Sequence, residues 1–161
     1  MKIKTTKLNK KLESLKAYLL DMNYAEPDEL NGLTVENCYN DSYKTFEVIG
    51  NEYKVLTDAE ADEEAKESIL NDLWAFNADF ILQHTEFYNN STDREDKEFC
   101  DSLKQLQGSI CESANSIVKA LICDIDEFVT NAIDADGRGH FLSFYDGEEH
   151  EQDEFFIYRT N

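Results

Sequence analysis

Residues 134–161, DADGRGHFLSFYDGEEHEQDEFFIYRTN, decide the predicted fold because they combine turn residues, aromatic segments and many acidic residues. The aromatic and β-branched residues of segments 140–145 and 154–158 favour a pleated strand. Asp146 and Gly147, which lie between these segments, supply the chemistry of a turn. The stretch therefore predicts the exit of a helix followed by one β-hairpin, with residues 146–153 as its loop.

The predicted loop is strongly acidic. No Lys or Arg separates its carboxylates, so neighbouring charges repel one another and keep the loop solvated. Such a loop attracts a cation or a basic partner. The alternative is a solvated surface loop that only keeps the chain soluble. The acidic residues are Asp146, Glu148, Glu149, Glu151, Asp153 and Glu154.

The chain of 161 residues fits one domain, since single domains commonly contain on the order of 100 to 200 residues. One proline and no Gly/Ser-rich linker give no sign of a domain boundary. The N-terminus lacks the apolar core of a signal peptide, and no apolar run approaches the roughly 18 residues of a membrane span. We therefore expect a single cytoplasmic domain over residues 1–161, without a membrane partner.

The net charge of −20 is unevenly distributed along the chain. Residues 1–16 hold six lysines and one glutamate, a balance of +5, which leaves −25 for the rest. This asymmetry predicts a short basic N-terminal arm that leads into the first helix of an acidic body. The body attracts a basic protein surface and repels DNA or RNA. Solubility, a salt-adapted host, or an arm that neutralises its own body are the alternatives.

Apolar residues at three- and four-residue steps predict the helices. The first helix covers about residues 7–23, and Asn77 caps a short helix that carries Phe80, Ile81 and Leu82. Gly108 suits the end of one helix, and Gly137 or Gly139 the end of the last. Four helices have a start signal with a Glu three residues later, at Thr57, Thr92, Ser109 and Asp124. The apolar face of the first helix is Leu8, Leu12, Leu15, Leu19 and Met22.

Segments 45–49 and 52–56 read as two strands, and Gly50-Asn51 between them is a two-residue hairpin signal. Together with the C-terminal hairpin, they complete the predicted architecture. We expect an α+β fold in which about five helices pack on a small antiparallel sheet built from two β-hairpins.

Two blocks of the sequence resemble phrases that recur in small acidic proteins of bacteriophages and mobile elements. The first joins YKVLTDAEAD at residues 53–62 to LWAFN at residues 73–77. The second joins DGRGHFLS at residues 136–143 to YDGEE at residues 145–149 and FIYRTN at residues 156–161. The resemblance implies a phage-type accessory protein in the host cytoplasm. It transfers no activity and no catalytic residue.

The residues indicate neither a metal site nor a cofactor. Asp134, Asp136 and Gly139 fit positions one, three and six of a calcium loop, but Arg138 and Tyr145 occupy positions that need oxygen ligands. The histidines His84, His140 and His150 are scattered, and no nucleophile motif or phosphate loop is present. The four cysteines, without C-x-x-C spacing, read as buried reduced thiols: Cys38, Cys100, Cys111 and Cys123.

One alternative is a small enzyme with an unrecognised site around Asp136, Arg138 and His140. A Gly-flanked turn can bring polar side chains together, which favours such a site. The more ordinary interpretation is that Arg138 pairs with an acid and that His140 starts a strand. We expect no catalytic residue and no enzymatic activity.

The leading functional hypothesis follows from the spacing of acidic residues. Acids three and four positions apart on a helix lie about 5 to 6 Å apart, which imitates the close and regular phosphates of a nucleic acid. We therefore expect an acidic protein that inhibits a basic, nucleic-acid-binding host protein, such as a restriction or CRISPR effector, without binding nucleic acid itself. The predicted binding residues are Glu60, Glu63, Glu64 and Glu67 on a helix, with Asp146, Glu148, Glu149, Glu151 and Asp153 on the hairpin loop.

The second hypothesis is an accessory protein that binds its partner by shape and aromatic contacts, with acidity serving only solubility. Alternate positions on a strand cannot all face the same core, so some aromatic residues should reach the surface. The candidate anchors are Tyr88, Phe144, Tyr145, Phe155 and Tyr158.

Overall fold

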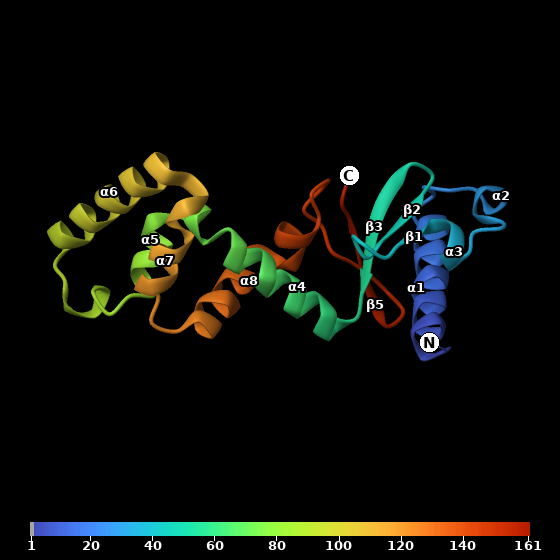
Figure 1. The fold of residues 1–161 in the computed structure, drawn as a ribbon, viewed down its shortest axis with the longest axis horizontal. Coiled ribbons are helices and arrows are strands. Elements are labelled where there is room, and N and C mark those ends of the chain that lie inside the picture. The colour runs from blue at the N-terminus through green and yellow to red at the C-terminus, as the bar shows by residue number, and fades with distance from the viewer. Residues whose placement is uncertain (1) are drawn as a thin grey trace. The chain divides into compact units, whose positions relative to one another are not determined.

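A computed structural model describes the backbone of residues 2–161 and the side chains from Thr6 onward. The chain forms two compact units (Figure 1). We call them the sheet unit, Met1–Ala65 with Asp136–Asn161, and the helical unit, Lys66–Ala135. The expectation that the whole chain is one domain stays a prediction.

The predicted α+β class is confirmed, because helices and one antiparallel sheet make up the described chain. The α-helices are α1 (Lys2–Asp21), α2 (Pro27–Leu30), α3 (Val35–Cys38), α4 (Asp58–Asn71), α5 (Ala78–Gln83), α6 (Asp93–Ile110), α7 (Asn115–Leu121) and α8 (Ile125–Leu142). Short 3-10 helices cover Leu73–Ala75, Tyr88–Asn90 and Cys111–Ala114. The strands are β1 (Tyr39–Asn40), β2 (Thr45–Val48), β3 (Asn51–Leu56), β4 (His150–Gln152) and β5 (Phe155–Arg159).

The sheet has the strand order β1-β2-β3-β5-β4, and every neighbouring pair is antiparallel. It contains the two expected hairpins, β2-β3 and β4-β5, and a third hairpin, β1-β2, whose first strand was not expected. The turn of the first hairpin is shifted by one residue from the prediction, because Val48 pairs with Asn51. Ile49 and Gly50 therefore form the turn, and both have positive φ, 52° and 72°. This conformation is the one that a two-residue hairpin turn of type I′ requires.

The first strand of the C-terminal hairpin lies later in the chain than expected. Residues 140–142 end α8, and β4 begins only at His150. The prediction that His140 starts a strand is therefore wrong. Gly137 has a non-helical backbone with a φ of 78°, so the regular helix from Ile125 ends at this glycine, as predicted, and a second helical stretch continues α8 to Leu142. The chain returns to a helix after Gly137, and this helical stretch buries the side chains of Phe141 and Leu142.

The absence of a side chain at Gly139 lets the end of α8 pack closely against the backbone of residues 147–149. A Cβ atom at this position would lie 2.4 Å from the carbonyl oxygen of Gly147 and 2.8 Å from the backbone nitrogen of Glu149. Only glycine allows this close approach of the helix to the following segment. The predicted acidic loop is therefore not a free loop. The backbone of residues 147–149 packs against Gly139, and Glu151 belongs to strand β4.

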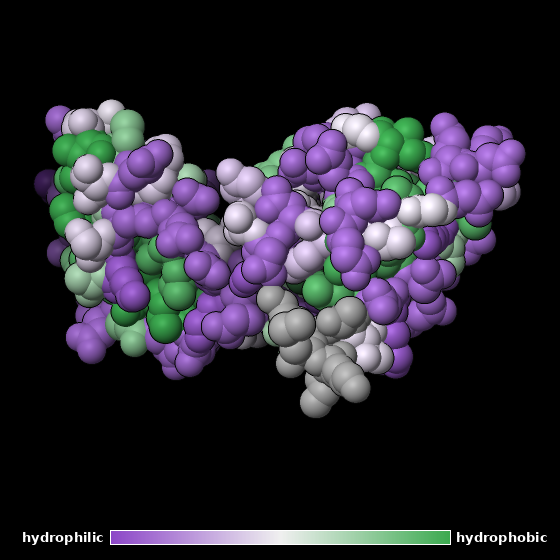
Figure 2. All heavy atoms as spheres, turned by 45° about the vertical axis from the view of Figure 1, so that its right-hand side comes forward, coloured by the Kyte–Doolittle hydropathy of each residue, from purple (hydrophilic) through white to green (hydrophobic). Residues whose placement is uncertain are grey.

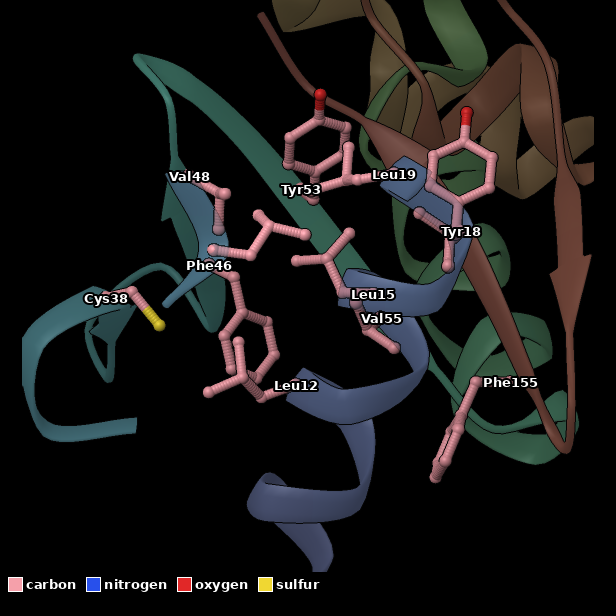
Figure 3. Close-up of a cluster of buried hydrophobic side chains, with 12 residues drawn as sticks. Leu12, Leu15, Tyr18, Leu19, Cys38, Phe46, Val48, Tyr53, Val55 and Phe155 are labelled. Carbon is pink, nitrogen blue, oxygen red and sulfur yellow. The ribbon is translucent and has the colours of Figure 1, made fainter. Parts of the chain in front are cut away.

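The core of the sheet unit lies between α1 and one face of the sheet. Figure 3 shows Leu12, Leu15 and Leu19 of α1 pointing toward Phe46 and Val55 on the strands. Burying each such side chain stabilises the fold by about 1.5 to 3 kcal/mol. Met22, expected on the same face, lies beyond the end of α1 and is 41% exposed.

The predicted basic arm is the beginning of α1, which starts at Lys2. The side chains of Lys2 and Lys4 lie outside the described ones. Lys7 and Lys11, one turn apart on the helix, both reach Glu60 on α4. The arm therefore attaches to the body of the sheet unit through an ion-pair network.

The helical unit confirms three of the expected helix starts and corrects one. Asn77 Oδ1 accepts a hydrogen bond from the Asp79 amide at 2.9 Å, and Thr92 forms a capping box with Glu95. Asp124 Oδ1 accepts from the amides of Asp126 and Glu127 at 3.0 Å.

No helix starts at Ser109, which lies inside α6. Its hydroxyl donates to the carbonyl of Gln105, one turn back along the same helix, so it does not cap a new one. The helix continues past Gly108 to Ile110, and α7 begins at Asn115.

The prediction of four buried reduced thiols is half right. All four thiols are free, but only Cys38 and Cys100 are buried, whereas Cys111 and Cys123 are exposed.

Candidate functional site

Glu60, the first of the predicted binding residues, forms ion pairs with two lysines of the same chain. The ammonium groups of Lys7 and Lys11 donate to its two oxygens at 2.7 Å each, and the amide of Thr57 donates at 2.9 Å. Burial by itself raises the pKa of Glu60, but the hydrogen bonds from Lys11, Lys7 and Thr57 outweigh it and lower the pKa to about 2. Glu60 thus joins α1 to α4 and is not free to meet a partner.

The next two acids on α4 differ from each other. Glu64 accepts from Lys54 at 2.6 Å, and its side chain is only 15% exposed. Glu63 is exposed and forms no ion pair with any described side chain. Both line a cavity of about 460 Å³ whose rim also carries Lys7, Lys11 and Lys44. This part of α4 therefore presents mixed charge and not a uniform row of carboxylates.

Arg138 pairs with three carboxylates of the sheet unit, two from α4 and one from the segment before β4. Its Nε and Nη2 atoms donate to the two oxygens of Glu149, at 2.9 Å each. Its Nη1 atom donates to Asp58 at 2.7 Å and to Asp62 at 2.9 Å. The hydrogen bonds to Glu149 are the main reason why the pKa of Arg138 is raised, although burial opposes this effect. The expectation that Arg138 pairs with an acid is confirmed.

The same network attaches the segment after α8 to the sheet. The hydroxyl of Tyr158 donates to Glu149, and the guanidinium of Arg138 lies 4.4 Å from the ring centroid of Phe156. Burial is the main cause of the raised pKa of Tyr158, followed by its hydrogen bond to Glu149. Glu149 therefore has a structural role, which the sequence did not indicate.

The remaining predicted loop residues also divide into carboxylates that are hydrogen-bonded within the fold and carboxylates that are exposed. Asp146 accepts from the Ser143 hydroxyl at 2.6 Å and from the Glu148 amide at 3.0 Å. The Ser14 hydroxyl lies 2.8 Å from the carbonyl oxygen of Gln152 and 3.2 Å from Asp153 Oδ2, so these two acceptors share one donor. Glu148 and Glu151 are exposed, and neither forms an ion pair with a side chain that the structure describes.

The structure thus separates the nine predicted binding residues into two groups. Five of them hold the fold together: Glu60, Glu64, Asp146, Glu149 and Asp153. Four are exposed and have no ion-pair partner in the described part of the chain: Glu63, Glu67, Glu148 and Glu151. Glu67 belongs to the helical unit and the other three to the sheet unit.

Sequence reasoning missed a pair of acids on the sheet. Glu47 on β2 lies directly opposite Glu52 on β3. Neither carboxylate forms an ion pair with a described base, and like charges in this position destabilise a sheet. The two residues are separated in the sequence by the hairpin turn, so only the strand register could reveal the pair.

Hydrophilic residues cover much of the molecular face drawn in Figure 2, with smaller hydrophobic patches between them. Among the proposed aromatic anchors, Phe155 and Tyr158 are buried in the core, with 3% and 0% exposure, so they cannot contact a partner. Phe144, Tyr145 and Tyr88 are exposed, by 75%, 58% and 45%.

No three His, Cys, Asp or Glu side chains among the described residues come together in an arrangement that could hold a metal ion. None of their helices combines the length and the apolar character that crossing a membrane requires. No protein-family model, curated protein or solved structure matches the chain.

Proposed function

We propose that the protein is a phage-type acidic interaction protein that binds a basic, nucleic-acid-binding surface of a host defence protein and inhibits it. The observation that supports this proposal is the opposed pair Glu47 and Glu52. Like charges facing each other across two strands cost stability, and no described base forms an ion pair with either carboxylate. A basic partner placed over the two carboxylates would relieve their repulsion, so the pair is better suited to binding than to folding.

The spacing of the opposed carboxylates also supports imitation of a nucleic acid. Opposed residues on two strands have Cβ atoms about 4.5 to 5.5 Å apart, and a helix places acids at similar spacing. Most described bases already form ion pairs within the chain: Lys7, Lys10, Lys11, Lys16, Lys54, Lys66, Arg94, Lys104 and Arg138. The excess negative charge therefore remains at the surface and attracts cationic proteins.

The test is a pull-down from host lysate with the tagged full chain, washed in parallel at low and at moderate salt. A partner captured through carboxylates should be lost as salt rises, because salt screens exposed charges. If the partner's nucleic-acid site is the surface that is bound, duplex DNA should displace it. Double substitution of Glu47→Gln with Glu52→Gln should weaken binding of the captured protein by about threefold to tenfold.

The matched control removes two exposed carboxylates elsewhere in the sheet unit, Asp21→Asn with Glu36→Gln, and keeps the net charge equal to that of the double variant. This control should bind nearly as tightly as the parent. Binding that resists both salt and duplex DNA would contradict capture by nucleic-acid mimicry.

Phe144 and Tyr145 favour a second candidate function, binding by aromatic contacts. Both are exposed, although the segment that carries them is fixed by hydrogen bonds from Ser143 to Asp146 and to the carbonyl of Arg159. Exposed aromatic side chains on an ordered segment lose little entropy on binding and are common binding hot spots. Phe144→Ala with Tyr145→Ala would abolish salt-resistant binding, whereas the Glu47 and Glu52 variants would leave such binding unchanged.

A further inference from the structure

The helical unit contains a second cavity, of about 370 Å³, that has no part in the proposed function. It lies between the end of α5, the segment around Tyr88 and the beginning of α8. Its wall includes His84, Tyr88, Cys123, Asp124, Glu127 and Asn131. These residues are far apart in the sequence, and only the packing of α5 against α8 brings them together.

The imidazole of His84 is fixed in one orientation and one tautomer. Its Nδ1 atom lies 2.8 Å from the carbonyl oxygen of Phe80, which can only accept, so Nδ1 carries the hydrogen. The Nε2 atom is then an acceptor, and it faces the side-chain amide nitrogen of Asn131 at 3.0 Å. The ring also packs edge-to-face on Phe128, with centroids 5.0 Å apart. These contacts leave Asn131 with its amide nitrogen engaged and its carbonyl oxygen without a described hydrogen bond.

The wall of the cavity is rich in acceptors and contains no Lys or Arg among the described residues. Asp124 uses one carboxylate oxygen to cap α8, and its other oxygen accepts no described hydrogen bond. Glu127 is exposed and forms no ion pair with a described side chain. Tyr88 adds an aromatic ring that is 45% exposed. The wall therefore carries two carboxylates and no described base, which favours a ligand that brings hydrogen-bond donors and positive charge.

We infer that this cavity binds a guanidinium group. A guanidinium is planar, carries five donors and stacks on aromatic rings, which matches carboxylates and an amide oxygen beside a tyrosine. An ammonium group would offer three donors at one point and would not stack in this way. The site belongs to the helical unit, whereas the opposed glutamates belong to the sheet unit.

Two sources can supply this chemistry. One is an arginine side chain on the basic partner, and this source rests on the proposed function. The other is a free small guanidinium compound, which does not depend on it. The experiment therefore uses the full chain with two pairs of probes: the capped peptide Gly-Arg-Gly against Gly-citrulline-Gly, and ethylguanidinium against ethylurea. Each pair compares a charged group with a neutral group of nearly the same shape.

The readout is the chemical shift of the Asn131 side-chain amide and the His84 ring in isotope-labelled protein. The guanidinium probes should shift these signals, and the neutral probes should not shift them at the same concentration. Glu127→Gln should weaken guanidinium binding by about threefold to tenfold. The matched control is Glu112→Gln, which changes an exposed glutamate of the same unit that does not line the cavity. This control should leave the affinity unchanged.

The two exposed thiols give an independent readout. Cys123 lines the cavity and Cys111 does not, and both are free. Bound guanidinium should slow the alkylation of Cys123 and leave that of Cys111 unaffected. A peptide that binds much more tightly than ethylguanidinium identifies a partner's arginine as the source. Similar affinities identify a free small compound.

Some results would overturn the inference. They are equal shifts with citrulline and arginine, shifts that spread over the surface carboxylates but omit His84 and Asn131, or equal effects of Glu127→Gln and Glu112→Gln. None of these results affects capture of a basic protein, because that proposal is tested separately through Glu47 and Glu52. Loss of capture with intact guanidinium binding would in turn overturn only the proposed function.

Discussion

Arg138 and Glu149 form a bidentate ion pair, with two parallel N–H···O contacts of 2.9 Å, between the last turn of α8 and the segment that leads into β4. The Arg138 side chain is 12% exposed and the Glu149 side chain 28%. Two parallel hydrogen bonds fix the geometry of both partners better than a single contact does. This pair therefore holds the segment that leads into β4 against the last turn of α8.

Loss of Arg138 should destabilise the protein strongly. Arg138→Gln leaves Glu149, Asp58 and Asp62 close together without their common cation, and removing one partner of a buried ion pair costs about 3 to 5 kcal/mol. Because Asp58 and Asp62 are largely exposed, we expect a loss of about 3 kcal/mol in the free energy of unfolding. Urea denaturation measures this loss.

The control for this prediction is Arg94→Gln. Arg94 pairs with Glu98 one turn along α6, and its side chain is 86% exposed. An exposed pair of this kind contributes about 0.3 to 0.5 kcal/mol. Equal losses for the two variants would show that the Arg138 network does not hold the sheet unit together.

The contribution of Glu60 should depend on pH. Its pKa in the folded protein, about 2, lies below the value of 4.5 for the unfolded chain. The carboxylate therefore stabilises the fold above about pH 4.5, and this stabilisation is lost as the pH falls from 4.5 toward 2. Because the side chain is 37% exposed, solvent reduces its contribution to on the order of 1 kcal/mol.

Urea unfolding of Glu60→Gln and of the parent at several pH values tests this expectation. The parent should be more stable at pH 7, and the difference should shrink toward zero as Glu60 becomes protonated. Glu63→Gln serves as the control, since Glu63 has no described ion pair. A difference between Glu60→Gln and the parent that stays constant with pH would exclude the ion pairs as its cause.

Neutralising the opposed glutamates should change stability and binding in opposite directions. Glu47→Gln removes the repulsion with Glu52 and should raise the free energy of unfolding by about 0.2 to 1 kcal/mol. The same substitution should weaken capture of the basic partner. Thermal denaturation and the salt-dependent pull-down measure the two effects on one preparation. A variant that is less stable, or that binds as tightly as the parent, would argue against a binding role for this pair.

Two glycines should respond oppositely to alanine. At Gly139 a Cβ would meet backbone atoms at 2.4 to 2.8 Å, so Gly139→Ala must displace residues 147–149 and should cost at least about 1 to 3 kcal/mol. At Gly108, inside α6, a Cβ meets no atom within 4 Å. Gly108→Ala should therefore stabilise the protein by about 0.5 to 1 kcal/mol. Equal responses in chemical denaturation would contradict the close packing at Gly139.

The sequence by itself determined the features that depend on a few neighbouring residues. Helix starts at Asn77, Thr92 and Asp124 follow from side chains that bond amides within three positions, so local spacing is sufficient to identify them. The apolar stripe of α1 follows from helical periodicity in the same way. The α+β class and the two hairpins were also predictable, because strand and turn residues alternate locally.

Only the tertiary structure decided which charges are free. Arg138 reaches Asp58 and Asp62 across the fold, and Lys11 reaches Glu60, so acids that look equivalent in the sequence divide into structural and exposed ones. The β2-β3 register places Glu47 opposite Glu52. Packing of α5 against α8 forms the cavity beside His84. These relationships depend on contacts between distant segments, which local propensity and periodicity do not contain.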